Sequence, residues 1–303
     1  MYGRSVFFIS AVMIVMLLAL LSPCSAYGSW EGSEGILIQN EELDGVRYDD
    51  YIRIFDVMGY LDYAGNLSLT SDMSVQVITI ENGGVLSPDV ILPVPEVIYV
   101  TSGTLMLTVN DEEFQAEKGD AVYIPSKATR RYANEADETV CFFSVTDQLP
   151  VPGDEESLYQ NVTKNQEDPV DITHVISENM VTGLELGSKE LNQSFHFSRL
   201  IHPLEGPYNT GFDLGTIRIF QGFGIPDHYV DGRYQLMTVL SGSGTISIGC
   251  HDYQVGRNDI IYVAPGAVMS AEASEEMELM ILVNPYYQEK FDKEIPYACD
   301  YLY

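Results

Sequence analysis

The sequence predicts an all-β protein made of two similar β-barrel domains in tandem. Short runs rich in β-branched and aromatic residues recur along the chain, and turn signals such as Thr101-Ser102-Gly103 separate them. Helical periodicity is scarce. The runs of the second half repeat those of the first at a constant offset of 139 residues. Short, regularly spaced strands are typical of a sandwich or barrel, and the repeat indicates an internal duplication.

The repeat aligns without a gap from about Met73 to Ser144. Its identities fall at turns and strand ends, where Gly103 meets Gly242, and the β-rich runs align with one another. The runs of the first half are 75–80, 96–100, 105–109, 121–125 and 139–145, and those of the second are 215–220, 235–240, 244–248, 259–264 and 279–283. The acidic stretch 149–171 separates the two sets and is typical of a linker or a surface excursion.

The N-terminus carries the pattern of a secretory signal peptide. Arg4 precedes an apolar run over 6–21, and Cys24-Ser25-Ala26 follows it. A basic start, an apolar stretch and small residues before the cut predict cleavage after Ala26, with a retained N-terminal anchor as the alternative. We therefore expect a protein that is secreted or extracytoplasmic, or tethered to a membrane by this segment.

The charge of the chain excludes two classes of partner. The 45 acidic and 15 basic residues give a net charge of −30. Binding to nucleic acid needs clustered Lys and Arg, and so does docking on an anionic membrane surface. We expect neither, and the oligomeric state stays open.

The cysteines leave one question open. Once a signal peptide is removed, Cys141, Cys250 and Cys299 remain, and no Cys-x-x-Cys pair is present. Three cysteines outside the cytoplasm allow one disulfide and one free thiol. The pairing stays undecided.

These features divide the chain into six segments. They are a signal peptide or anchor (1–26), an N-terminal arm (27–60), a first barrel domain (61–148), an acidic linker and entry segment (149–190), a second barrel domain (191–287) and a C-terminal tail (288–303).

The spacing of several residues in each repeat resembles the two signature motifs of the cupin family. In the first repeat the kept positions are Gly83, Glu96, Gly103, Gly119 and Pro125, and the three His positions read Asp89, Ile91 and Arg130. In the second, the glycines are Gly222 and Gly242, His228 is kept, and Val230, Gln235 and Met269 replace the other ligands. The resemblance implies two tandem double-stranded β-helix, or jelly-roll, barrels of the bicupin type.

The departures from the motifs predict barrels without a metal. Cupins usually hold a divalent metal through His and Glu side chains, but a fixed cation at Arg130 would repel it, and only His228 is a good ligand in the second repeat. We expect Arg130 to contact Glu96 and to neutralise it in place of a metal. No cofactor is expected, and a divalent metal at His228 is the alternative.

The motif positions and the nearby tyrosines give the candidate site. The candidate ligand-binding residues are Glu96, Tyr123 and Arg130 in the first barrel and His228, Tyr234, Gln235, Tyr262 and Met269 in the second. No catalytic residue is assigned. Since the cupin family includes enzymes, storage proteins and binding modules, three functions remain open.

The first is an exported, non-catalytic binding module for a small organic acid or a carbohydrate. The second is an enzyme with an atypical site around His228, and the third is a structural or storage-type bicupin.

Overall fold

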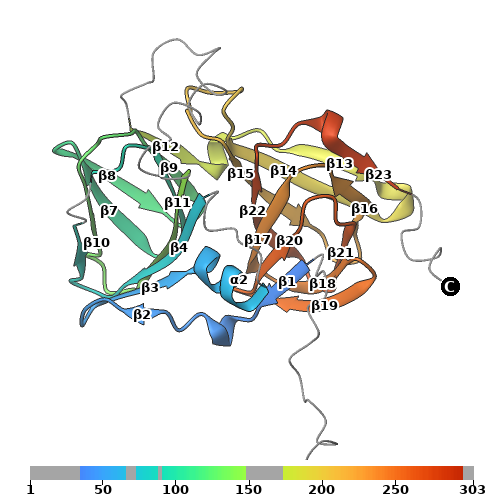
Figure 1. Cartoon of the computed structure of the whole chain (residues 1–303), viewed down its shortest axis with the longest axis horizontal. Coiled ribbons are helices and arrows are strands. Elements are labelled where there is room, and N and C mark those ends of the chain that lie inside the picture. The colour runs from blue at the N-terminus through green and yellow to red at the C-terminus, as the bar shows by residue number, and fades with distance from the viewer. Residues whose placement is uncertain (1–34, 66–72, 88–90, 148–172, 296–303) are drawn as a thin grey trace, which may run out of the picture. The chain divides into compact units, whose positions relative to one another are not determined.

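The structure is a computed structural model that describes residues 35–65, 73–87, 91–147 and 173–295. The predicted signal peptide and most of the acidic linker lie outside the described residues. Within the described part the chain is almost entirely β-strand, with one α-helix, α2 (Val57–Gly65). Figure 1 shows the strands gathered into two barrels, coloured blue to green and yellow to red. The prediction of an all-β, two-barrel fold is confirmed.

The first barrel consists of a seven-stranded sheet that faces a four-stranded one. The larger sheet has the order β12-β9-β6-β11-β4-β3-β2, and the smaller sheet has the order β5-β10-β7-β8. The strands are β2 (Val46–Arg47), β3 (Ile52–Asp56), β4 (Met73–Ile80), β5 (Val85–Leu86), β6 (Glu96–Ser102), β7 (Thr104–Val109), β8 (Glu112–Glu117), β9 (Asp120–Ile124), β10 (Arg130–Ala133), β11 (Val140–Asp147) and β12 (His174–Ser177).

The second barrel repeats this plan with one additional strand. Its sheets have the orders β1-β20-β17-β22-β15-β14-β13 and β19-β18-β21-β16-β23. The strands are β1 (Gly35–Ile38), β13 (Leu184–Ser188), β14 (Gln193–Ile201), β15 (Asp213–Ile219), β16 (Gly224–Val230), β17 (Tyr234–Ser241), β18 (Ser243–Ile248), β19 (His251–Gly256), β20 (Ile260–Val263), β21 (Met269–Ala273), β22 (Met277–Asn284) and β23 (Asp292–Glu294). Four short 3-10 helices complete the described elements: η1 (Asn40–Glu42), η3 (Glu178–Met180), η4 (Lys189–Leu191) and η5 (Glu289–Phe291).

The backbone itself carries the offset of 139 residues. Every residue from β4 to β10 with a left-handed φ has a left-handed counterpart 139 positions later. The pairs are Gly83 and Gly222, Gly103 and Gly242, Asn110 and Gly249, Asp111 and Cys250, Gly119 and Asn258, and Lys127 and Gly266. Because non-glycine residues rarely adopt this conformation, the matching positions show that the turns have the same geometry, as a duplication predicts.

The last strand departs from the predicted ungapped alignment. Glu96 on β6 pairs with Thr146, whereas Gln235 on β17 pairs with Val283, so the offset there is 137. Six residues separate Ala133 from Val140 at the start of β11, whereas four separate the equivalent Glu272 from Met277 at the start of β22. The alignment is therefore confirmed through β10 and wrong for β11.

The two barrels exchange an edge strand. Strand β1, from the predicted N-terminal arm, pairs with β20 in the second barrel, and β12, which precedes the second repeat, pairs with β9 in the first. The arm also supplies β2 and β3, and the linker segment supplies β13. Both barrels therefore extend beyond the predicted boundaries 61–148 and 191–287.

Three apolar cores follow from this arrangement. One fills the interior of each barrel, and the third lies between the two seven-stranded sheets, where helix α2 packs against it. Both faces of the central strands of these sheets are thus buried. Since successive side chains of a strand point to opposite faces, neighbours on one strand enter different cores.

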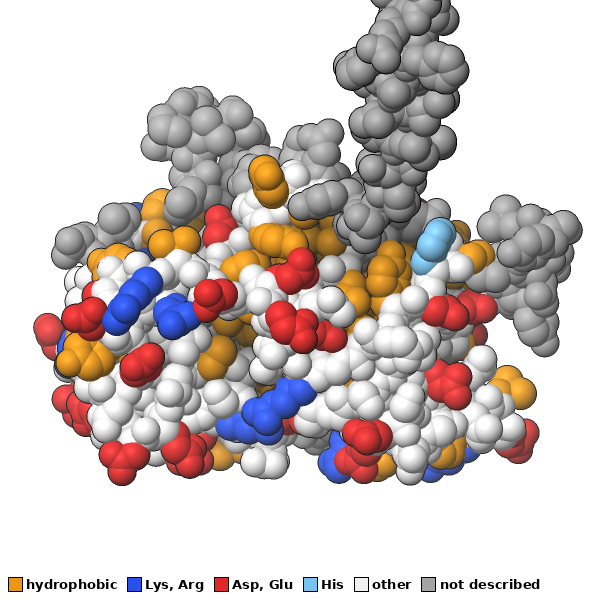
Figure 2. Space-filling view, turned by 90° about the horizontal axis from the view of Figure 1, so that it is seen from below, with side chains coloured by type: hydrophobic (Ala, Val, Ile, Leu, Met, Phe, Trp, Pro, Cys, Tyr) orange, Lys and Arg blue, Asp and Glu red, His pale blue; other side chains and the backbone are white. Residues whose placement is uncertain are grey.

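The charge of the surface agrees with the acidic composition of the chain. On the face drawn in Figure 2, acidic side chains are scattered and basic ones form no continuous patch. Cys141 is a free thiol and Cys250 is disulfide-bonded. Within the described ranges, no helix is long and apolar enough to cross a membrane.

Candidate functional site

An ion pair crosses the interior of the first barrel. Arg130 begins β10 in the four-stranded sheet, and its cross-strand partner Val109 belongs to the barrel core, so both side chains point inward. Glu96 begins β6 in the opposite sheet. The Nε of Arg130 lies 2.7 Å from Oε2 of Glu96, and the two side chains are only 8% and 5% exposed. The predicted contact between these residues is confirmed.

Two hydroxyl groups also hold the Glu96 carboxylate. Tyr132 donates a hydrogen bond to Oε2 at 2.7 Å, and Ser144 donates one to Oε1 at 2.5 Å. Burial, followed by the nearby Glu96 charge, raises the pKa of Tyr132 well above its ordinary value, so its hydroxyl keeps the proton that it donates. The buried carboxylate is therefore compensated on both oxygens.

The two ends of the Arg130 guanidinium have different surroundings. Nε is fully buried and makes no hydrogen bond of good geometry, so its contact with Glu96 is a close ion pair. Neither Nη1 nor Nη2 belongs to the described buried nitrogens without a partner, and the Tyr132 hydroxyl lies within hydrogen-bonding range of the guanidinium. Glu96 therefore anchors the Nε end, and Tyr132 stands beside the same group.

Ile91, at the second His position of the first motif, does not join this cluster. Asp89 lies outside the described residues, so its predicted share in the ion pair stays a prediction. Ile91 is 54% exposed.

The second barrel brings together three of its predicted residues. Met269 is the cross-strand partner of His228, and the two therefore share a face. Gln235 pairs with Val263 and Val283, which belong to the interior core, and it is buried. The Nδ1 of His228 lies 3.0 Å from the carbonyl oxygen of Pro226. The interior offers an imidazole, an amide and a thioether, with no charged pair.

The structure removes three predicted tyrosines from the barrel interiors. Tyr123, Tyr234 and Tyr262 all belong to the core between the sheets. Tyr234 and Tyr262 contact each other with ring centroids 5.8 Å apart. Tyr234 precedes Gln235, and neighbouring residues on a strand point to opposite faces, so only Gln235 faces the barrel interior. These three tyrosines therefore do not face the barrel interiors, whereas Tyr132 belongs to the core of the first barrel.

The described residues of neither barrel suit a divalent metal. In the first, Arg130 places a permanent positive charge against the single carboxylate, and this charge would repel a cation. In the second, His228 is the one strong donor beside Gln235 and Met269, while zinc, iron and copper prefer several imidazole, thiolate or carboxylate ligands. Among the described residues no group of three or more His, Cys, Asp or Glu side chains is arranged to hold a metal.

Sequence reasoning missed the part played by Ser144. Ser144 lies in the run 139–145, in which the other residues are apolar except Thr139 and Cys141. A single serine in such a strand does not indicate which group its hydroxyl will bind. The hydroxyl could have been assigned to Glu96 only with the register of β11 against β6, because Ser144 pairs with Ile98, two residues from Glu96 on the same face.

Two protein families match the chain. The family described as a cupin domain matches residues 76–146, and the family described as an AraC-like ligand binding domain matches residues 214–284. Each match falls within one of the two barrels. A search of curated proteins finds no match.

Solved structures with both barrels are similar over most of the chain. A structure described as a glyoxylate-induced protein from Pseudomonas aeruginosa has a TM-score of 0.65 at 14% identity, covering 86% of this chain and 89% of that one. Vicilin from hazelnut, Corylus avellana, has a TM-score of 0.64 at 13% identity, with 86% and 87% covered. A variant of oxalate decarboxylase from Bacillus subtilis has a TM-score of 0.62 at 13% identity, with 86% and 79% covered. At these identities the similarity concerns the fold alone.

Proposed function

Because the chain is a two-domain cupin protein, we propose that it is a binding module in which the first barrel holds a small organic acid at Arg130. One observation carries this proposal. Glu96 anchors the guanidinium of Arg130 through Nε, and the Tyr132 hydroxyl stands beside a group that carries five N–H donors in all. The barrel thus presents a fixed positive group with hydrogen-bond donors to spare.

A carboxylate is the ligand that suits this group best. A guanidinium donates two parallel hydrogen bonds to a carboxylate, and the planar group loses little freedom on binding when it is already fixed. Glu96 does not compete for the Nη donors, because its own oxygens already contact Nε and the hydroxyls of Tyr132 and Ser144. The small exposure of the Arg130 side chain favours a small acid.

The second barrel supports a weaker candidate. It matches a ligand-binding family, and His228 and Gln235 are its polar interior residues. Glu294, the exposed cross-strand partner of His228 on β23, forms no ion pair with it, so these uncharged interior groups suit a neutral ligand such as a carbohydrate. His228 contacts a carbonyl oxygen and makes no described contact with a carboxylate, so it lacks the partner that commonly orients a catalytic histidine. This favours binding over an atypical enzyme at His228.

A thermal-shift screen with small mono-, di- and tricarboxylic acids and with monosaccharides tests the proposal. At least one acid should raise the melting temperature of the wild type, since a ligand that binds only the folded state stabilises it. R131M is the matched control, because Arg131 is the next residue on β10 and points to the other face. R131M should respond as the wild type does.

The double variant E96Q/R130M separates binding from folding. It removes both charges together, as the second barrel does with Gln235 and Met269. It should fold and show no shift with the acid. Stabilisation by sugars alone, or an equal shift by the acid in the double variant, would contradict the proposal.

We also propose that the protein acts outside the cytoplasm, on the basis of the N-terminal pattern alone. N-terminal sequencing of the mature protein should begin at or near Tyr27. A soluble cytoplasmic protein that keeps Met1 would refute it.

A further inference from the structure

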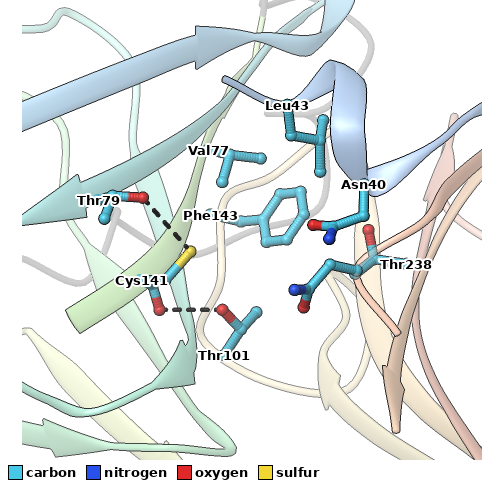
Figure 3. A pocket seen from close by; sticks show the side chains of 9 residues that line it. Asn40, Leu43, Val77, Thr79, Thr101, Cys141, Phe143 and Thr238 are labelled. Carbon is cyan, nitrogen blue, oxygen red and sulfur yellow. Dashed lines mark hydrogen bonds between the residues drawn. The ribbon is translucent and has the colours of Figure 1, made fainter. Parts of the chain in front are cut away.

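A cavity of about 160 Å³ opens between the two barrels, away from both barrel interiors (Figure 3). One wall is the outer face of the first barrel's large sheet, and the other comes from η1 and the second barrel. The lining residues are Asn40, Leu43, Val77, Thr79, Thr101, Cys141, Phe143, Thr238 and Asn258. None of these side chains carries a formal charge.

The cavity exists because the repeat is broken at one position. Thr238 on β17 corresponds to Tyr99 on β6, and their partners Ile260 and Ala121 correspond in the same way. Tyr99 is fully buried in the core between the sheets and fills its side of that core. A threonine occupies much less volume, so the related place in the second barrel stays open.

The floor of the cavity has an unused hydrogen-bonding group. Thr238 is 3% exposed, and its Oγ1 is buried with no hydrogen-bond partner in the part of the chain that the structure describes. Its cross-strand partners Ile260 and Met280 belong to the core between the sheets, so its side chain faces the first barrel. A buried hydroxyl without a partner costs about 1–3 kcal/mol, which a hydrogen bond from a bound molecule would recover.

The walls combine polar groups with an apolar surface. Asn40 and Asn258 are exposed at the mouth, and η1 is held there by a hydrogen bond from the Asn40 backbone to Asp259 at 2.8 Å. Leu43, Val77 and Phe143 supply apolar contacts, as Figure 3 shows around the ring of Phe143. Hydroxyls and amides beside an apolar face match a molecule with hydroxyl groups on a carbon chain.

We propose that this cavity binds a small neutral polyol. Its volume of about 160 Å³ suits a small occupant of a few carbon atoms. The absence of charge in the lining disfavours an acid. The site is separate from Arg130 and does not depend on the function proposed for the first barrel.

Cys141 supplies a reporter within the site. It is a free thiol in the cavity wall, with Thr79 Oγ1 3.9 Å from its sulfur and Thr101 Oγ1 donating to its carbonyl oxygen at 3.0 Å. A bound polyol would cover the thiol. The rate at which iodoacetamide alkylates Cys141 therefore measures occupancy, and mass spectrometry of the peptide that carries Cys141 separates it from other cysteines.

The experiment measures this rate in the full-length protein with glycerol, erythritol or xylitol. At least one of them should slow alkylation saturably, by about tenfold when its concentration is about ten times its Kd. Sucrose at equal osmolality controls for general compaction, because it is too large for the cavity. Equal protection by sucrose, or no protection by any of the three polyols, would overturn the proposal.

Two variants of Thr238 locate the binding. T238Y copies Tyr99, fills the cavity and should abolish saturable protection. T238V keeps the space and removes the hydroxyl, so it should weaken binding by about fivefold, the worth of one hydrogen bond, even if T238Y fails to fold. Unchanged protection in a folded T238Y, or unchanged affinity in T238V, would overturn the assignment.

Discussion

Replacing Arg130 by Met leaves the Glu96 carboxylate buried in the first barrel without its cation. The two side chains are 8% and 5% exposed, and 2.7 Å separates Nε from Oε2, so the pair is desolvated on both sides. Methionine stands at the corresponding place in the second barrel, where Met269 packs in an apolar interior. The substitution therefore changes the charge while keeping a side chain that this fold accommodates.

The expected loss follows from what remains around Glu96. Breaking a buried ion pair by removing one partner costs about 3–5 kcal/mol. Tyr132 and Ser144 would still donate to the carboxylate, so we expect the lower end of this range, about 3 kcal/mol. E96Q should cost a similar amount, because it leaves Arg130 buried without an anion. In E96Q/R130M neither charge is left alone, and the loss should be smaller than the sum of the single losses by about 2 kcal/mol or more.

Urea unfolding followed by circular dichroism gives these free energies. Amide hydrogen exchange of peptides from β6 and β10 should show that the loss is confined to the first barrel, since two domains need not unfold together. R131M, on the other face of β10, should stay within about 0.5 kcal/mol of the wild type. A stable R130M, or single losses that simply add in the double variant, would refute the reasoning.

Three further predictions concern pH, backbone and topology. Burial, above all, raises the pKa of Asp213 from 3.8 to about 7, so the folded state binds this proton more tightly. The free energy of unfolding should therefore fall as the pH rises from about 4 to 7. In urea melts at several pH values, D213N should flatten this dependence on pH. An unchanged slope in D213N would contradict the assignment to Asp213. G242A should destabilise the protein more than G222A. An added Cβ at Gly242 would lie 2.0 Å from the Glu276 carbonyl oxygen. At Gly222 an added Cβ would meet nothing within 4 Å, so only the left-handed φ of 76° disfavours alanine there. Equal losses in thermal melts would show that the contact is relieved elsewhere. I38D places a charge at a fully buried position of β1, which pairs with β20 of the second barrel. Amide exchange should therefore accelerate more in β20 than in β9 of the first barrel. A larger acceleration in β9 would contradict the strand exchange.

Much of the fold and the central ion pair could be predicted from the sequence, because both depend on local spacing. The left-handed turns repeat at the offset of 139 that the aligned glycines indicate. Glu96 falls in the first signature motif and Arg130 in the second, and the two positions converge inside the barrel. The motif's carboxylate is kept as Glu96, and a cation, Arg130, replaces one of the motif's histidines. Their opposite charges alone therefore predict that the two side chains contact each other.

The facing of the tyrosines could not be predicted, for a physical reason. Strands β6, β9 and β17 are buried on both faces, so apolar and aromatic residues occupy most of their positions and no regular alternation marks the barrel side. Tyr123 and Tyr262 are as buried in the core between the sheets as they would be inside a barrel. The exchange of β1 and β12 was equally hidden, since a strand of four residues carries no signal of which sheet it joins.

The most direct test of the central claim is calorimetric titration of a small carboxylic acid into the wild type, R130K and E96Q/R130M. The acid is the one that gives the largest thermal shift in the screen. The account predicts one site per chain in the wild type and a Kd about 10- to 100-fold higher in R130K, because lysine keeps the charge and loses the paired donors. It predicts no measurable binding in the folded double variant. An acid that binds all three proteins equally, or a wild type that binds no acid at all, would contradict it.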